Sequence, residues 1–176
     1  DYVVTEAGFG ADLEAEKCLR QIISAKYPDH GIFGEELPTV NPGSDFTWYI
    51  DPIDGTRNFA NHIPTWGTIL GLHYQGEPVV GVIDHPGVNL IYSGGAGLGA
   101  FCNGERLQIR DNGSTKIDDN EIIVVSNRGM FERSGEAALF DNFIRCHPTV
   151  YIYHDVFAST RAIQGCMGAM VEFNVK

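Results

Sequence analysis

The chain has 176 residues, of which 43% are hydrophobic, so it is long enough for one sizeable core and short for two ordinary domains. Its 23 acidic and 12 basic residues give a formal net charge of −11, which argues against binding to nucleic acid or to an anionic membrane surface. The four cysteines form no C-x-x-C pair and no apolar run approaches the ~20 residues that span a bilayer, so we expect one globular unit, or a piece of one, in the cytoplasm.

The first predicted element is an amphipathic helix over residues 12–26, where apolar side chains recur at helical spacing. The helix should end before Pro28, because proline disfavours the helical conformation of the residue that precedes it. A short strand-like segment at residues 32–33 leads into Gly34-Glu35-Glu36. After a loop rich in turn-forming residues, the run 46–50 is predicted to be a buried strand that ends at Asp51.

The middle of the chain predicts an antiparallel sheet followed by a hairpin. Apolar, β-branched runs separated by turns predict consecutive strands at 68–74, 78–85 and 89–93. Asn103-Gly104 is the strongest local signal for a hairpin turn. Beyond the polar stretch 110–120, we expect a core strand at 121–126, a helix at 136–146, a strand at 150–153, a helix around 159–170 and a strand at 171–175.

The segment that carries chemistry is Asp51-Pro52-Ile53-Asp54-Gly55-Thr56, at the end of a predicted strand. Two carboxylates three residues apart can converge on hard cations, and a backbone carbonyl of the turn can add a ligand. If a helix starts here, the N–H groups of Gly55 and Thr56 can face a phosphate. The ordinary interpretation of an isolated D-x-x-D-G is a strand-to-helix turn with Asp54 as N-cap. Glu35-Glu36 favours the metal site, since neighbouring carboxylates in a partly buried place need a cation or protons.

The spacing of these segments resembles the inositol monophosphatase family over most of residues 12–110. The shared pattern is Asp12-x-x-x-Glu16, Tyr27-Pro28-x-His30, Gly34-Glu35-Glu36, Trp48-x-x-Asp51-Pro52-Ile53-Asp54-Gly55-Thr56-x-Asn58-Phe59 and Gly97-x-Gly99-Ala100-Phe101-x-Asn103-Gly104. The resemblance implies an α+β fold of layered α-β-α-β-α type, with mixed and antiparallel sheets. It also implies one phosphatase domain over residues 1–176, with a metal and phosphate half (1–110) and a substrate-side half (111–176).

The resemblance also implies a role for each matching residue. Glu35, Asp51, Asp54 and the Ile53 carbonyl would hold Mg²⁺, with Asp51 bridging two ions. Thr56, paired with Asp12, would help Glu35 to orient and deprotonate the attacking water. Asp54 and the N–H groups of Gly55 and Thr56 would bind the phosphate, while Glu172 would contact substrate hydroxyls. A lithium-sensitive homodimer acting on a small phosphorylated metabolite is the expected form.

Two departures from the family pattern leave alternatives open. Phe9-Gly10-Ala11 stands where the family has Thr-x-Ala, and the preceding helix is expected to be missing or shortened. The chain also ends at Lys176, before an expected Trp-Asp pair, so the fold is expected to be incomplete at both ends and the chain by itself to bind magnesium weakly and hydrolyse almost nothing. The function is then an inositol monophosphate-like phosphatase, a phosphatase for histidinol phosphate or fructose 1,6-bisphosphate, or a metal-binding remnant without turnover.

Overall fold

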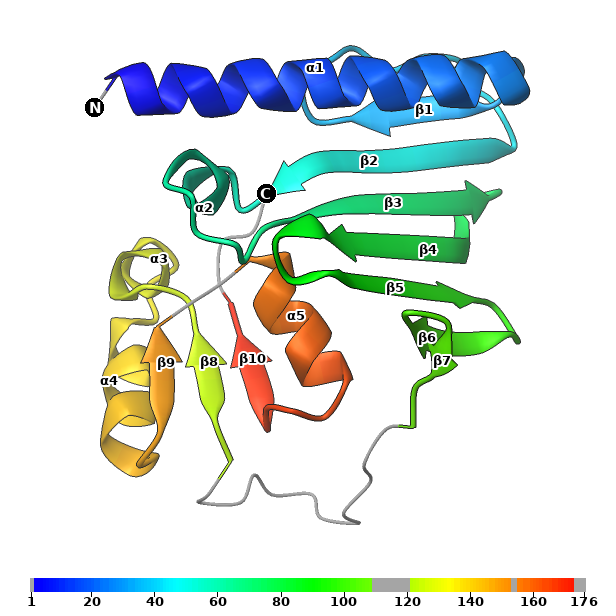
Figure 1. Cartoon of the computed structure of the whole chain (residues 1–176). Helices are drawn as coiled ribbons and strands as arrows, with labels where there is room; N and C mark the ends of the chain where they lie inside the picture. The colour runs from blue at the N-terminus through cyan, green and yellow to red at the C-terminus, as the bar shows by residue number, and fades with distance from the viewer. Residues whose placement is uncertain (1, 109–120, 153–154, 173–176) are drawn as a thin grey trace. The chain divides into compact units, whose positions relative to one another are not determined.

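The computed structural model describes residues 2–108, 121–152 and 155–172 (Figure 1). The chain forms two compact units, Asp1–Leu107 and Gln108–Lys176. Among the described residues, no helix is both long and apolar enough to cross a bilayer. The assignment of a metal and phosphate half and a substrate-side half, divided after residue 110, stays a prediction.

The first unit is built on a seven-stranded sheet whose strands follow one another in chain order. The strands are β1 (Gly31–Gly34), β2 (Phe46–Asp54), β3 (Gly67–Tyr74), β4 (Glu77–His85), β5 (Leu90–Gly95), β6 (Gly99–Cys102) and β7 (Glu105–Arg106). β1 is parallel to β2 and every later pair is antiparallel, so the sheet is mixed, as the family resemblance implies. A 3₁₀ turn, η1 (Pro86–Val88), joins β4 to β5.

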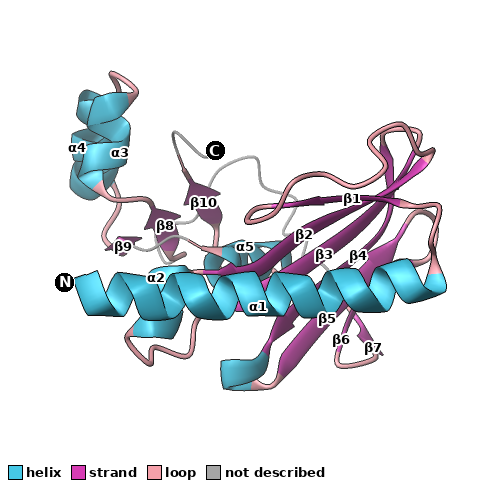
Figure 2. Cartoon of the chain, turned by 90° about the horizontal axis from the view of Figure 1, so that it is seen from above, coloured by secondary structure: helices cyan, strands magenta, loops and turns pink. Residues whose placement is uncertain are grey.

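Helix α1 (Tyr2–Lys26) lies across one face of this sheet (Figure 2). Buried Ile23 packs against Ile32 of β1 and Ile50 of β2, which attaches the C-terminal half of the helix to the sheet. The predicted start at residue 12 is wrong, because the helical backbone begins ten residues earlier and continues through Gly8 and Gly10. The predicted end before Pro28 is correct.

Strand β2 also extends beyond its prediction. Its first part pairs with β1 and β3, and its pairing with β3 continues to Asp54, not only to the predicted end at Asp51. The register shifts between Asp51 and Asp54, where Pro52 lacks the N–H that a regular ladder needs. After Gly55, the short helix α2 (Thr56–Ala60) begins.

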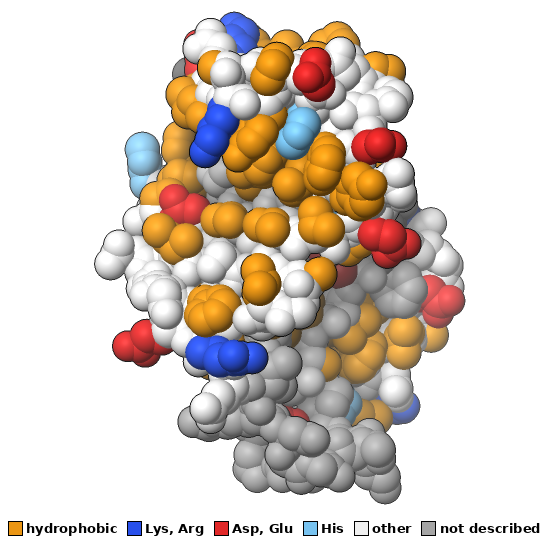
Figure 3. Space-filling model, turned by 90° about the vertical axis from the view of Figure 1, so that its right-hand side faces the viewer, with side chains coloured by type: hydrophobic (Ala, Val, Ile, Leu, Met, Phe, Trp, Pro, Cys, Tyr) orange, Lys and Arg blue, Asp and Glu red, His pale blue; other side chains and the backbone are white. Residues whose placement is uncertain are grey.

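The sheet's hairpin turns form where the sequence predicts them. Gln75 and Gly76 between β3 and β4, and Asn103 and Gly104 between β6 and β7, all have positive φ values, as type I′ turns require. Large hydrophobic side chains remain exposed on this unit, including Phe33, Phe46, Tyr49 and Tyr74. Figure 3 shows one side of the molecule on which hydrophobic side chains gather.

An aromatic stack closes the end of the first unit where α1 stops. The His30 ring lies between the rings of Tyr27 and Phe46, with centroid distances of 4.8 and 4.9 Å. Nε1 of Trp48 donates a hydrogen bond of 3.0 Å to Nδ1 of His30. The loop between α1 and β1 is thereby attached to the start of β2.

The second unit contains a parallel three-stranded sheet in the order β10-β8-β9. Its elements are β8 (Ile123–Val125), α3 (Arg128–Arg133), α4 (Ala137–Cys146), β9 (Val150–Ile152), α5 (Val156–Ile163) and β10 (Ala169–Val171). Ile123 and Val125 form a buried cluster with Phe131 of α3 and Phe140 of α4. The other face of the sheet meets α5, where the Ser159 hydroxyl contacts the sulfur of Met170 at 3.2 Å.

Three predictions for the second unit need correction. Helix α3 was not predicted, although Asn127 caps it by accepting a hydrogen bond from the Met130 N–H. Helix α5 starts and ends earlier than the predicted 159–170. Its end is earlier because Gly165 at φ 75° turns the chain out of the helix. Strand β10 begins at residue 169, two residues before the predicted start. The polar stretch 110–120 and the end of the predicted strand 171–175 lie outside the described residues.

Candidate active site

The turn between β2 and α2 places the central motif at the end of the sheet. Gly55, at φ 87° and ψ 39°, is the N-cap of α2, so the interpretation of Asp54 as a simple N-cap is wrong. The hydroxyl of Thr68 on β3 donates to the Pro52 carbonyl at 2.8 Å and fixes the turn to the next strand. The Thr56 hydroxyl lies 3.0 Å from the carbonyl oxygen of Ile53, the predicted backbone ligand.

Helix α1 delivers the second component of the site. Asp12 is only 2% exposed, and its Oδ2 lies 3.3 Å from Oγ1 of Thr56. One turn earlier, Gly8 faces the same threonine, and a Cβ on Gly8 would lie 2.9 Å from Thr56 Cγ2. The missing side chain at Gly8 therefore allows α1 to approach α2 closely enough for the predicted Asp12–Thr56 pair to form.

The register between β1 and β2 determines where Glu35 lies. Gly34 of β1 is paired with Ile50 of β2 in a parallel arrangement, so Glu35 and Asp51 follow at the same edge of the sheet. Asp51 comes directly after Ile50, which is 4% exposed, and Glu35 comes three residues after Ile32, which is 1% exposed. The structure thus brings Glu35 next to Asp51, as a shared site requires.

The carboxylates of this region raise one another's pKa values. Burial, followed by the charges of Asp54, Glu35 and Asp12, raises the pKa of Asp51 to about 7. Burial, followed by the charges of Glu36 and Glu35, raises the pKa of Asp12 to about 6, against a hydrogen bond from Thr56 that lowers it. The pKa of Glu36 is raised by burial and by Glu35. Concentrated negative charge is therefore the main electrostatic property of the site.

The donor chemistry fits a hard divalent cation. Oδ1 of Asp12 and Oδ1 of Asp51 are buried without a hydrogen-bond partner, and they are two of the three such side-chain atoms that the described part of the chain contains. Unpartnered carboxylate oxygens beside further carboxylates are the ligands that Mg²⁺ prefers. Across the described residues, no three His, Cys, Asp or Glu side chains are yet grouped tightly enough to hold a metal ion.

One predicted residue lies in the second unit, and two acids near the site were assigned no role. Glu172, the predicted contact to substrate hydroxyls, is half-buried in the second unit, directly after β10. Glu36 was not assigned a role, although it is a leading cause of the raised pKa of Asp12. Glu16 entered the family spacing without a role; its position one helical turn after Asp12 is the signal that could have drawn attention to it.

The sequence matches the family described as "Inositol monophosphatase family" over residues 5–165. The chain is 44% identical over 109 residues to a histidinol-phosphatase of Chlorobaculum parvum, covering 62% of this chain and 40% of the relative. It is 39% identical over 105 residues to a fructose-1,6-bisphosphatase/inositol-1-monophosphatase of Aquifex aeolicus, covering 60% of this chain and 40% of the relative. The chain therefore spans well under half the length of these relatives.

Comparison with solved structures identifies the fold. The extragenic suppressor protein SuhB of Bartonella henselae superposes with a TM-score of 0.81 at 23% identity, covering 94% of this chain and 64% of that one. An inositol monophosphatase of Zymomonas mobilis gives a TM-score of 0.73 at 29% identity, covering 89% and 58%. The predicted α+β class with mixed and antiparallel sheets is confirmed.

Proposed function

Because the chain belongs to the inositol monophosphatase family, we propose that the full-length protein that carries it is a magnesium-dependent hydrolase of a small phosphate monoester. The observation that carries the proposal is the group of Asp12, Glu35, Asp51 and Asp54 beside Thr56, with two buried carboxylate oxygens that lack partners. A merely structural turn would not need so many acids, since their mutual repulsion destabilises the fold unless a cation offsets it.

In this proposal Glu35, Asp51, Asp54 and the Ile53 carbonyl hold the metal. The carbonyl oxygen of Ile53 accepts from Thr56, and its second lone pair stays able to ligate. Bound magnesium would supply neutralisation of the phosphoryl oxygens and a lower pKa for the attacking water.

The other residues act on protons and on the phosphate. The single Thr56 proton has two acceptors within reach, the Ile53 carbonyl oxygen at 3.0 Å and Oδ2 of Asp12 at 3.3 Å. When the proton is donated to Asp12, the Thr56 oxygen can accept a hydrogen bond from the attacking water. Glu35 would orient the same water. The N–H groups of Gly55 and Thr56, together with Asp54, would bind the phosphate, and Glu172 would contact the substrate's hydroxyl groups.

Inositol monophosphate-like esters are the first substrate class proposed. Histidinol phosphate is the second candidate, because the Chlorobaculum histidinol-phosphatase shares 44% identity with this chain. Fructose 1,6-bisphosphate is a third, supported by the Aquifex relative at 39% identity. Homodimer formation and a cytoplasmic location stay predictions from the sequence.

A phosphate-release assay with the full-length protein tests the proposal. The panel contains inositol 1-phosphate, histidinol phosphate and fructose 1,6-bisphosphate, each with Mg²⁺ and with EDTA. We expect Mg²⁺-dependent release from at least one ester, and Asp51→Asn should abolish it because the change keeps the shape but removes the charge. Near-normal activity of Asp51→Asn would refute the site assignment, and a wild-type protein that binds Mg²⁺ without turnover would support the remnant alternative.

A further inference from the structure

A buried carboxylate on α1 holds the loop that contains Glu35. Glu16 is 0% exposed and lies one turn after Asp12 on α1. Its Oε2 accepts a hydrogen bond of 2.7 Å from the Glu36 N–H, and its Oε1 accepts one of 3.2 Å from the Leu37 N–H. Two successive backbone amides directly after Glu35 are thus bound to one side chain.

Arg20 completes this arrangement from the next turn of the helix. Its Nε donates to Oε1 of Glu16 at 2.6 Å, so the buried charge is paired. Its Nη1 and Nη2 donate to the carbonyl oxygens of Pro38 and Leu37, each at 2.9 Å. The guanidinium therefore donates to carbonyl oxygens of the loop, while Glu16 accepts hydrogen bonds from N–H groups of the same loop.

Gly34, directly before Glu35, packs against the same Glu16 carboxylate. Gly34 faces Glu16 so closely that a Cβ at this position would lie 2.7 Å from Oε2 and closer still to Oε1 and Cδ. Glu35 is consequently flanked on both sides by backbone whose position is set by Glu16. Asp12 and Glu16 lie on one face of α1, so the same helix positions both Thr56 and Glu35.

We propose that Glu16 and Arg20 are positioning residues, whose function is to hold Glu35 where the metal and the attacking water need it. The inference rests on the proposed function and extends it to two residues that touch neither metal nor substrate. Neither loop amides nor loop carbonyls require a buried ion pair, since water can satisfy them at a surface. Fixing a metal ligand does require rigid outer partners, and removing such partners typically costs 10–100-fold in metal affinity or activity.

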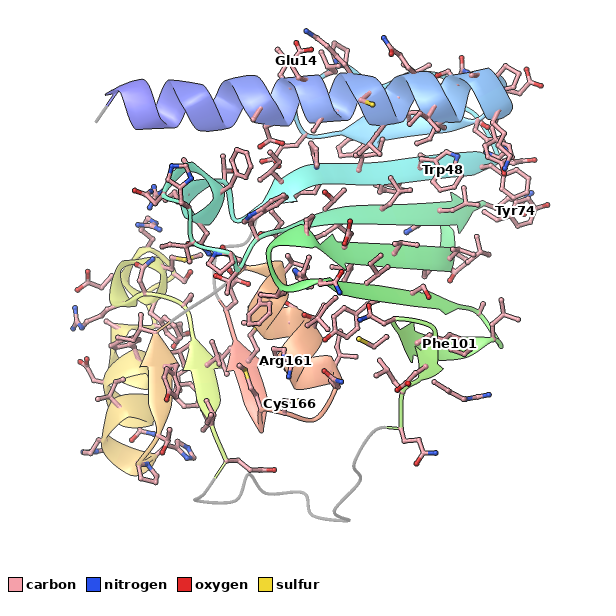
Figure 4. The ribbon with its side chains drawn as sticks, in the orientation of Figure 1. Glu14, Trp48, Tyr74, Phe101, Arg161 and Cys166 are labelled. Carbon is pink, nitrogen blue, oxygen red and sulfur yellow. The ribbon has the colours of Figure 1, made fainter. Side chains whose placement is uncertain are left out.

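The test compares variants of the full-length protein by two independent measurements. Mg²⁺ affinity is measured by calorimetry without substrate, and kcat and KM are measured by phosphate release. Arg20→Lys keeps the positive charge beside Glu16 but loses the pair of hydrogen bonds to the Pro38 and Leu37 carbonyl oxygens. Arg20→Met also removes the charge. Glu14→Gln is the matched control, because it removes an exposed ion pair with Lys17 on the outward side of the same helix (Figure 4).

For Arg20→Lys we expect roughly tenfold weaker Mg²⁺ binding and a lower kcat with little change in KM. Arg20→Met should lose more on both measures, and Glu14→Gln should match the wild type. Amide exchange at Glu36 and Leu37 should accelerate in the Arg20 variants, while that of β3 stays slow.

Two results would overturn the inference in different ways. If Arg20→Lys folds with wild-type Mg²⁺ affinity and kcat, or loses only stability, then the ion pair is structural and has no positioning role. If the wild-type protein itself shows no Mg²⁺-dependent phosphate release, then the proposed function fails, and the positioning role fails with it. Arg20→Lys decides the question even if Arg20→Met does not fold, since it leaves no unpaired charge in the interior.

Discussion

Replacing Gly34 with alanine should strongly destabilise the first unit, because the new methyl group would overlap the Glu16 carboxylate. The nearest approach of real Cβ atoms is about 3.0 Å, and all three outer atoms of Glu16 would be closer than that. The carboxylate cannot rotate away without breaking its bonds to the Glu36 and Leu37 amides and to Arg20. Breaking a buried, paired charge costs about 3–5 kcal/mol, and we expect a loss of that order.

Gly10→Ala is the matched control for this prediction. Gly10 is an exposed residue of α1, and a Cβ there would meet nothing within 4 Å. Alanine in a helix is favoured over glycine by about 0.5–1 kcal/mol, so this variant should be slightly more stable than the wild type. Urea denaturation followed by circular dichroism measures both changes. A Gly34→Ala variant within about 1 kcal/mol of the wild type would show that Glu16 is not held as tightly as its hydrogen bonds indicate.

Three further predictions concern the carboxylates, the hydroxyl and the metal. Thr56→Ala should lower kcat more than it raises KM, whereas Thr56→Ser should keep most of the activity; a pure KM effect would mean that Thr56 only holds substrate. Since folding raises the pKa values of Asp12 and Asp51 above 3.8, their stabilising contribution is complete below about pH 4 and is lost as the pH rises through 6 to 7. The metal-free protein should therefore be less stable at pH 8 than at pH 5, by on the order of 1 kcal/mol for Asp12 alone, because only about one pKa unit of its shift lies above pH 5, and Mg²⁺ should restore stability at pH 8. Equal unfolding free energies at both pH values without Mg²⁺ would contradict this. Lithium chloride should inhibit turnover of the full-length protein, and potassium chloride at the same ionic strength should not.

The sequence predicts the central turn well because its information is local. Pro52 fixes its own φ and Gly55 permits the positive φ that the turn needs, and the acids at 51 and 54 directly precede these two residues. The Asn103-Gly104 hairpin is predictable for the same reason, since both residues tolerate positive φ.

Features that depend on distant contacts are less predictable. The N-terminal extension of α1 passes through Gly8, a poor helix former, and depends on close packing against Thr56, 48 positions away, which periodicity does not reveal. The extension of β2 beyond Asp51 depends on its pairing with β3 across a register shift. The contacts of Glu16 and Arg20 reach the loop 17 to 21 residues away, so helical spacing predicts only that these two side chains share a face.

The hydrogen bond between Trp48 and His30 selects one form of the imidazole ring. An indole nitrogen can only donate, so Nδ1 of His30 must offer its lone pair, and the proton of the neutral ring resides on Nε2. The flanking rings of Tyr27 and Phe46 prevent the imidazole from turning over to exchange its two nitrogens without separating the stack. The hydrogen bond that joins the start of β2 to the loop after α1 therefore depends on one tautomer of His30.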